Sequence, residues 1–545
     1  MISRILNSQS KTVTFSALIL LGASLVSGVL GLLRNRMLVQ AFGAGEVFDA
    51  YLAAFRVPDL LSGILIFGGV SAAFLPIFAT LAQKEKEQVW EFVSNVLYVL
   101  VGVLSALSLV LIMVAPFFIH WIAPGFSTEQ ALLAVSLTRI MLVAPVLFGA
   151  SSILSSVLQY FDRFMAYALA PIFYNMGIIA GIVFLAPLWG IWGVAAGVVA
   201  GALLHLGVQV PSAIASGFRL KRIFRPRDPS VLRLLALALP RIPSAAAFHI
   251  NLVVMTALAS FLSAGSITIF TLANDIQYIP VGLIGVPFAL AVFPALSRAA
   301  AQLNGKDFIN SFSLTLRQII FFVVPIAILL FLLRAQTVRV LYGAGTFGWE
   351  ETRLTAAILG IFSMGVVFYA LVPFLARTFF SLQNTVIPMT VSLVSMGLNI
   401  ILAFLFMGIL EGGVFREILA SFLRLGHIQD IRVLALPLAM VCSGALHAVL
   451  LGVMLWPRFR EFPSKEVFSS LGKIAVSSLV MGGVVYLTLL FMGTAVFELR
   501  TFWEVFSQLT VAGVAGVLAY IFSSLILRSP ELFSLKTAFQ KQLEQ

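Results

Sequence analysis

Long apolar runs separated by short polar segments dominate this chain. A membrane-spanning helix needs about 20 consecutive apolar residues, and about fourteen runs of that length occur. Pro and Gly interrupt several of them, as membrane helices tolerate where neighbouring helices satisfy the backbone. The pattern predicts an all-α polytopic membrane protein. The runs cover roughly residues 13–33, 50–80, 92–118, 131–158, 165–185, 187–211, 231–262, 268–296, 310–333, 353–378, 386–410, 431–456, 470–495 and 503–527.

The composition agrees with this pattern. Of 545 residues, 61% are hydrophobic and 10% are charged, whereas soluble domains carry about 25% charged residues. The single cysteine, Cys442, excludes an intrachain disulfide, and one Cys with five scattered His cannot form a metal cluster. The N-terminal segment leads into a run too long for a signal-peptide core and has no evident cleavage site, so we expect a retained first helix. The net charge of +12 lies mostly between apolar runs, which indicates membrane topology rather than nucleic-acid binding.

Lys and Arg concentrate in alternate loops, and cytoplasmic loops are the ones enriched in these residues. The richest loop is the connector 217–233, GFRLKRIFRPRDPSVLR, which we interpret as a positive-inside anchor or a contact with anionic lipid. Both termini are therefore predicted to be cytoplasmic, as an even number of spans requires. The opposite loops carry a thinner set: Arg34, Arg36, Arg334, Arg339, Arg353, Arg416, Arg424, Arg432 and Arg500.

The two halves of the chain resemble each other. AAFLPIFATLAQ (72–83) pairs with LAVFPALSRAAAQ (290–302), and PGFSTEQ (124–130) pairs with GTFGWEE (345–351). Both shifts skip an even number of spans, so the repeats share one topology and are related by an axis along the membrane normal. We expect an N-terminal lobe of six helices (1–216), the basic linker (217–233), a C-terminal lobe of six helices (234–456), and two additional helices with a cytoplasmic tail (457–545).

Two smaller features indicate how helices lie and pack. Gly193, Gly197 and Gly201 recur at four-residue intervals, which lets a neighbouring helix approach closely. Segment 411–432 is amphipathic at helical spacing. It predicts a helix in the outer membrane interface or a plain loop helix.

Charged residues within the apolar runs are the candidates for chemistry. A charge at the bilayer centre costs roughly 2.5–3.5 kcal/mol on insertion scales, so such side chains usually face a bundle interior or a wet cavity. For Arg34 and Arg36, snorkelling to the interface is the alternative. Arginines outnumber acids, which favours an anionic cargo, because guanidinium binds phosphate oxygens in bidentate fashion. The candidate binding residues are Arg34, Arg36, Asp49, Arg56, Asp59, Arg241 and Asp275.

Other polar residues and motifs have simpler explanations. Asn399 is a weak candidate for cation coupling, and an interhelical hydrogen bond explains it more simply. His249 is either a hydrogen-bonded core histidine or a proton relay. GAGTFG (343–348) follows no strand and is not a nucleotide-binding loop. We expect no catalytic residue, no metal and no cofactor, with transport driven by Na⁺, H⁺ or the membrane potential.

At family level, the chain resembles the MurJ/MviN lipid II flippases of the multidrug/oligosaccharidyl-lipid/polysaccharide exporter superfamily. The resemblance is carried by GLLRNRMLVQAFGAGEVFDAYLAAFRVPDLL (31–61), AFLPIF (73–78), LTRIMLVAP (137–145), DRFMAYALAPIFYN (162–175), residues 259–298 and ARTFFSLQNTVIP (376–388). It implies fourteen helices in two six-helix lobes, with two further helices forming a lipid groove.

The resemblance also implies a function in cell-wall biogenesis at the bacterial inner membrane. The cargo would be the undecaprenyl-pyrophosphate-linked peptidoglycan precursor, moved to the outer leaflet by alternating access, with cavity arginines on the pyrophosphate. Membrane lipids and cell-wall synthesis proteins would be its partners. Arg34 and Asp49 match family positions. Departures from the family pattern are Asn35 in place of a common acid, Gly28, Ser62 and Asp275 in place of arginines, and Phe67 in place of a glutamate.

Arg36, Arg56 and Arg241 restore the positive field in our interpretation of these departures. Two alternatives stay open from the sequence. One is an exporter of another lipid-linked oligosaccharide or of a small molecule. The other is a transport-inactive scaffold for envelope assembly.

Overall fold

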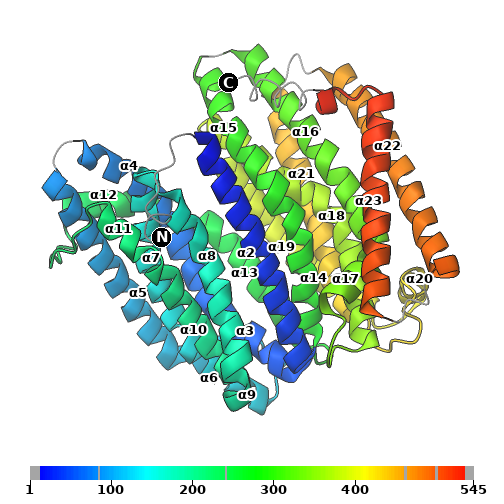
Figure 1. Cartoon of the computed structure of the whole chain (residues 1–545), viewed down its shortest axis with the longest axis horizontal. Coiled ribbons are helices and arrows are strands. Elements are labelled where there is room, and N and C mark those ends of the chain that lie inside the picture. The colour runs from blue at the N-terminus through cyan, green and yellow to red at the C-terminus, as the bar shows by residue number, and fades with distance from the viewer. Residues whose placement is uncertain are drawn as a thin grey trace. The chain divides into compact units, whose positions relative to one another are not determined.

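The computed structural model describes residues 13–83, 86–239, 242–302, 304–458, 463–496 and 501–533. Within these ranges every regular element is a helix (Figure 1). Twelve of the helices are long and apolar enough to cross a membrane. The chain is therefore a multi-pass membrane protein. Two further predicted runs correspond to the continuous segment α3–η1–α4 and to helix α13, so the predicted all-α polytopic fold is confirmed.

By internal packing the chain divides into two compact units, residues 1–268 and 269–545. Helix α13 packs on η1, α3 and α5 and so belongs to the N-terminal unit. At its end, the Ser260 hydroxyl accepts a hydrogen bond from the Gly125 amide at 3.0 Å. A Cβ at Gly125 would lie 2.2 Å from the Ser260 carbonyl oxygen, so this approach requires glycine. Packing units need not coincide with a sequence repeat, and the domain boundaries expected from the repeat stay a prediction.

The N-terminal unit begins with α2, which continues to Phe42, beyond the predicted run. Arg34 and Arg36 are therefore inside this helix rather than near its end. Pro58 lies inside α3, and a π-helical segment, η1, follows it; such segments occur often at functional sites. The elements are α2 (Val13–Phe42), α3 (Glu46–Leu61), η1 (Ser62–Val70), α4 (Ser71–Ala82), α5 (Lys86–Ile122), α6 (Thr128–Met141), α7 (Val143–Tyr160), α8 (Phe164–Ala180), η2 (Gly181–Leu185), α9 (Ala186–Trp189), α10 (Ile191–Gly207), α11 (Val210–Ala215), α12 (Pro229–Ala238) and α13 (Ile242–Ser260).

The glycines of α10 let α8 and η2 approach closely, as the sequence predicts. A Cβ at Gly177 would lie 2.2 Å from the Gly201 Cα, and one at Gly181 would lie 2.6 Å from the Gly197 Cα. Side chains at these positions would force the helices apart. The contact holds α8 in the position from which it meets α2.

The basic connector is attached to α5 by buried side chains. Asn95 donates to the Arg225 carbonyl at 2.9 Å and accepts from the Arg225 amide at 2.7 Å. The Ser94 hydroxyl accepts from the Lys221 amide at 2.9 Å, and Lys221 pairs with Glu91 at 3.2 Å. The connector is thus fixed alongside the first turns of a spanning helix; its proposed contact with anionic lipid stays a prediction.

The C-terminal unit starts within α14 (Ser266–Pro280). A π-helical segment follows Pro280 directly, and α20 confirms the helix expected within 411–432, whose place in the membrane interface stays a prediction. The remaining elements are η4 (Val281–Gly285), α15 (Val286–Ala301), α16 (Gly305–Leu332), α17 (Arg334–Tyr342), α18 (Trp349–Ser381), α19 (Val386–Ile409), α20 (Val414–Phe422), η5 (Arg432–Leu434), α21 (Ala435–Leu455), η6 (Trp456–Arg458), α22 (Ser464–Phe491), η7 (Met492–Val496) and α23 (Phe502–Ile526).

Helices α22 and α23 pack on each other, and α22 packs on α16. Buried polar groups join them at several levels. The Tyr520 hydroxyl donates to the Phe321 carbonyl at 2.7 Å, and Gln336 donates to the Gln508 side chain at 3.1 Å. The last two spans are thus attached firmly to the rest of this unit.

Candidate charged site in the N-terminal unit

Arg34 is the centre of a polar network between α2 and α8. Its Nε and Nη2 donate to the Asn35 Oδ1 at 3.1 and 2.9 Å, and its Nη1 donates to the Asn175 Oδ1 at 3.1 Å. Asn175 is itself oriented by donating to the Ser27 hydroxyl at 3.2 Å and to the Pro171 carbonyl at 3.1 Å. The guanidinium is therefore held in place by amides whose own positions are determined by helix backbone.

The partners of Arg34 are neutral. Among the described residues, Arg34 makes no ion pair with a carboxylate. The Asn35 amide oxygen accepts two hydrogen bonds from the Arg34 guanidinium without adding negative charge. The site therefore keeps the full positive charge of this arginine.

Asp59 and two buried tyrosines share the surroundings of Arg34. The charges of Arg34 and Asp59 both act on the hydroxyls of Tyr51 and Tyr174. Tyr51 belongs to α3 and Tyr174 to α8, so the predicted residues Arg34 and Asp59 are brought into one neighbourhood by three helices. Binding of the cargo by Arg34 and Asp59 stays a prediction.

Arg56 faces α13. Its Nε donates to the Thr256 hydroxyl at 2.9 Å, and its charge acts on His249. The His249 ring lies over Gly63 in η1, where a Cβ would come within 1.9 Å of the ring nitrogen. Arg56 therefore lies at the contact between α3, η1 and α13, where the neutral Thr256 hydroxyl accepts one of its hydrogen bonds.

Asp49 occupies a structural position. Its carboxylate is buried, and it accepts hydrogen bonds from the Thr268 amide at 2.8 Å, the Thr268 hydroxyl at 2.6 Å and the Gly265 amide at 2.7 Å. These donors lie at the start of α14, where a helix N-terminus favours negative charge. The carboxylate thus joins α3 to this helix start, and the predicted substrate contact is not needed to explain it.

The remaining predicted residues fall elsewhere. Arg36 is partly exposed on α2 in the same unit. Asp275 and the buried Asn399 belong to the C-terminal unit, on α14 and α19. Arg241 lies outside the described residues. The structure therefore brings Arg34, Arg56 and Asp59 onto neighbouring helices, while the roles of the others stay predictions.

Sequence reasoning missed the residues that orient the arginines. Asn175 and Thr256 are polar residues in apolar runs, 141 and 200 positions away from their arginine partners. A lone amide one turn after Pro171 was a usable signal, because buried amides need partners. The identity of that partner was not readable from spacing.

The family model described as "Lipid II flippase MurJ" matches residues 38–506. A protein of Rhizobium tropici named "Probable lipid II flippase MurJ" is 30% identical over 479 residues, covering 85% of each chain. The "Lipid II flippase MurJ" of Burkholderia cenocepacia is 29% identical over 381 residues, covering 68% of this chain and 74% of that protein.

Solved structures of a flippase and of a transporter are also similar to this chain. "Lipid II flippase MurJ, inward closed conformation" matches with a TM-score of 0.74 at 25% identity, covering 94% of this chain and 99% of the other. An inward-facing multidrug resistance MATE family transporter of the MOP superfamily matches with a TM-score of 0.62 at 14% identity, covering 82% of this chain and 98% of the other. The second likeness concerns the fold alone. The relatives are named as flippases and transporters rather than enzymes.

Proposed function

Because this chain belongs to the lipid II flippase MurJ family, we propose that it moves lipid II, the undecaprenyl-pyrophosphate-linked peptidoglycan precursor, from the cytoplasmic to the outer leaflet of a bacterial membrane. Support comes from the family model, which spans most of the chain, and from relatives that carry this name over most of their own length. In this proposal, the cellular role of the protein is to supply the precursor for peptidoglycan synthesis.

We propose that the cargo is held by Arg34. A guanidinium has five N–H donors, and the three hydrogen bonds to Asn35 and Asn175 use one on each of its nitrogens. One N–H on each terminal nitrogen therefore remains for a ligand. Two remaining donors on a positively charged group suit hydrogen bonding to pyrophosphate oxygens.

The surroundings favour an anion over a cation. Arg34 donates to amide oxygens, and Arg56 donates to the Thr256 hydroxyl. Of the carboxylates in this unit, Asp49 already accepts three hydrogen bonds, and Asp59 shares the surroundings of Arg34. A cavity for cationic drugs would need carboxylates directed at the ligand. A lipid-linked pyrophosphate fits this charge distribution better.

Alternating access is the transport mode we propose. In it, the charged site would open to one leaflet and then to the other. Support comes from the fold shared with transporters solved in inward-facing and outward-facing states. Each charge that crosses the full membrane potential contributes about 2.3 kcal/mol per 100 mV. A net-positive site would therefore respond to the membrane potential.

Complementation tests this function. The wild-type chain should restore growth to a bacterium depleted of its own lipid II flippase. Arg34→Gln should fail and Arg34→Lys should restore growth partly, because lysine keeps the charge without the planar donor pair. Arg416→Gln, on α20, is the matched control and should restore growth fully.

Each outcome has a definite meaning once immunoblots show equal membrane expression. Failure of the wild type would overturn lipid II transport and favour another lipid-linked saccharide or a scaffold role. Growth with Arg34→Gln at the wild-type rate would keep the function and overturn the role of Arg34.

A further inference from the structure

A second group of arginines lies at one end of the C-terminal unit, where α17, the start of α18 and the loop after α20 meet. We call Arg334, Arg353, Arg424 and His427, together with Trp349, the α17–α18 arginine cluster. All of these residues belong to the C-terminal unit. Figure 1 shows α17 and α20 toward the same end of this unit.

Direct contacts join the members of the cluster. The Arg353 guanidinium contacts the His427 ring in a hydrogen bond and lies 5.1 Å from the Trp349 ring centroid. The Arg339 guanidinium also lies over the Trp349 ring, 5.7 Å from its centroid. One exposed tryptophan is therefore shared by two guanidinium groups, which cation–π attraction holds in place.

Arg334 and Arg424 extend the cluster. Burial, followed by the like charge of Arg424, lowers the pKa of Arg334 below its ordinary value. Arg334 packs against Gly360, on α18, and donates to the Phe331 carbonyl at 2.6 Å. The like charges of Arg334 and Arg424 repel one another, and this repulsion costs free energy unless another interaction offsets it.

Among the described residues, no carboxylate pairs with these arginines to offset the repulsion between their charges. Arg334, Arg353 and Arg424 form no ion pair there. The nearby acids Glu350 and Glu351 lie in the first turn of α18, where the helix dipole itself favours negative charge.

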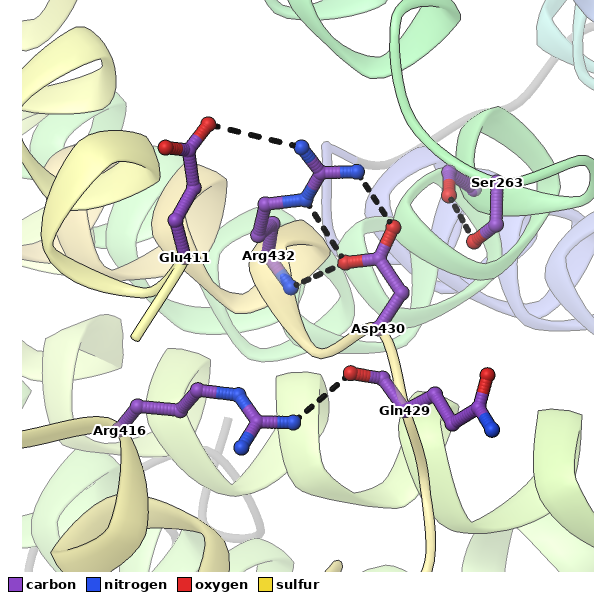
Figure 2. Close-up of polar contacts among 7 residues, drawn as sticks. Ser263, Glu411, Arg416, Gln429, Asp430 and Arg432 are labelled. Carbon is purple, nitrogen blue, oxygen red and sulfur yellow. Dashed lines mark hydrogen bonds and ion pairs between the residues drawn. The ribbon is translucent and has the colours of Figure 1, made fainter. Parts of the chain in front are cut away.

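In contrast to the cluster, the arginines Arg416 and Arg432 of the loop between α19 and α21 have partners within that loop (Figure 2). Arg432 pairs with Asp430 at 2.9 Å and with Glu411 at 3.6 Å, and Arg416 donates to the Gln429 carbonyl at 2.8 Å. These contacts close the base of the loop between α19 and α21. Because the loop is closed, Arg424 and His427 are presented from a fixed backbone rather than from a free chain.

Topology does not account for the cluster either. Its arginines belong to the loops predicted to be external, and Lys and Arg are depleted in such loops. Three arginines without an ion pair among the described residues, Arg334, Arg353 and Arg424, therefore need another explanation. We propose that the α17–α18 arginine cluster is a binding site for a phosphate group, formed wholly by the C-terminal unit and additional to the charged site around Arg34.

Phosphate is the ligand class that fits. Guanidinium forks match phosphate oxygens in bidentate geometry, and His427 adds a ring nitrogen beside Arg353. The phosphate can come from a lipid headgroup in the adjoining leaflet or from a soluble phosphate or pyrophosphate. Both sources share the same oxyanion chemistry.

Pyrophosphate titration of the full-length chain in phosphatidylcholine nanodiscs tests the site, with tryptophan fluorescence as the readout. Every protein carries Arg34→Gln, which removes binding at the first site. Trp349 is the expected reporter, so the signal should vanish in Trp349→Phe. Arg353→Gln with Arg424→Gln should weaken binding about tenfold or more, as the loss of charged hydrogen bonds predicts. Arg298→Gln, at an exposed arginine in the last turn of α15, is the control and should bind as the parent does.

A second arm distinguishes the sources. In nanodiscs that also contain phosphatidylglycerol, weaker pyrophosphate binding would show that lipid headgroups occupy the site, and unchanged binding would indicate a soluble phosphate. The unfolding temperature of each variant, measured without ligand, shows whether that variant is folded. The proposal is overturned if the parent shows no saturable binding, or if the double variant binds with the same affinity. None of these measurements needs transport, so the test is independent of the flippase proposal.

Discussion

Two amides, Asn35 and Asn175, occupy the hydrogen-bonding positions around Arg34 where carboxylates would form ion pairs. An amide satisfies the donors of a guanidinium without cancelling its charge. A carboxylate in either place would hold the arginine as well but would lower its attraction for an anionic ligand. At the scale of single residues, the chemistry of the site therefore depends on neutral partners as much as on the arginine.

Asp49 gives a residue-scale prediction. Asp49→Ala would leave two buried amides and the Thr268 hydroxyl without an acceptor, and we expect a loss of stability of about 3 kcal/mol. Thermal unfolding of the purified protein measures this loss. Transport per folded molecule should stay close to the wild-type rate, because the carboxylate joins α3 to the start of α14. A stable variant with lost transport would instead place Asp49 in substrate binding.

At the scale of helices, buried polar groups decide how the last two spans are attached. Glu531 follows α23 and is 1% exposed. It accepts hydrogen bonds from Ser470 and Ser529 at 2.7 Å each, and the Arg317 Nη1 lies 3.8 Å from its Oε1. One carboxylate thus joins α16, α22 and the end of α23.

Glu531→Gln should destabilise the protein by about 3 kcal/mol, because it leaves the partly buried Arg317 without its charge partner. The double variant Arg317→Gln with Glu531→Gln should lose less than the sum of the two single variants. Lys473→Gln, which removes an exposed hydrogen bond between the same helices, is the control and should cost less than about 1 kcal/mol. Additive effects in thermal unfolding would show that the pair does not interact.

The sequence predicts the positions of the helices, whereas it does not predict the contacts between them. Apolar runs determine where spans lie, and the Gly193–Gly197–Gly201 spacing correctly indicated a close helix contact. The partner of Asp49 lies 219 positions away and that of Arg34 lies 141 positions away. Such pairings depend on tertiary packing, which no local pattern encodes. The length of α2 and the π-helical segment after Pro58 were missed for the same reason.

At the scale of the whole molecule, the distribution of Lys and Arg among the loops predicts the membrane orientation. The basic connector is predicted to be cytoplasmic and the α20 loop external. In a Cys442→Ser background, Glu417→Cys should react with a membrane-impermeant maleimide in intact cells. Arg222→Cys should react only after permeabilisation, since both positions are exposed on the protein. The reverse labelling pattern would invert the orientation and place the α17–α18 arginine cluster on the cytoplasmic side.

We propose that Arg34, held by neutral amides, binds the pyrophosphate of the cargo during translocation. The most direct measurement is lipid II translocation in reconstituted vesicles, compared between the wild type and Arg34→Gln at equal reconstitution. We predict that the wild type speeds translocation and that Arg34→Gln slows it about tenfold or more, as loss of a charged, bidentate contact implies. Equal rates for the two proteins would contradict the account.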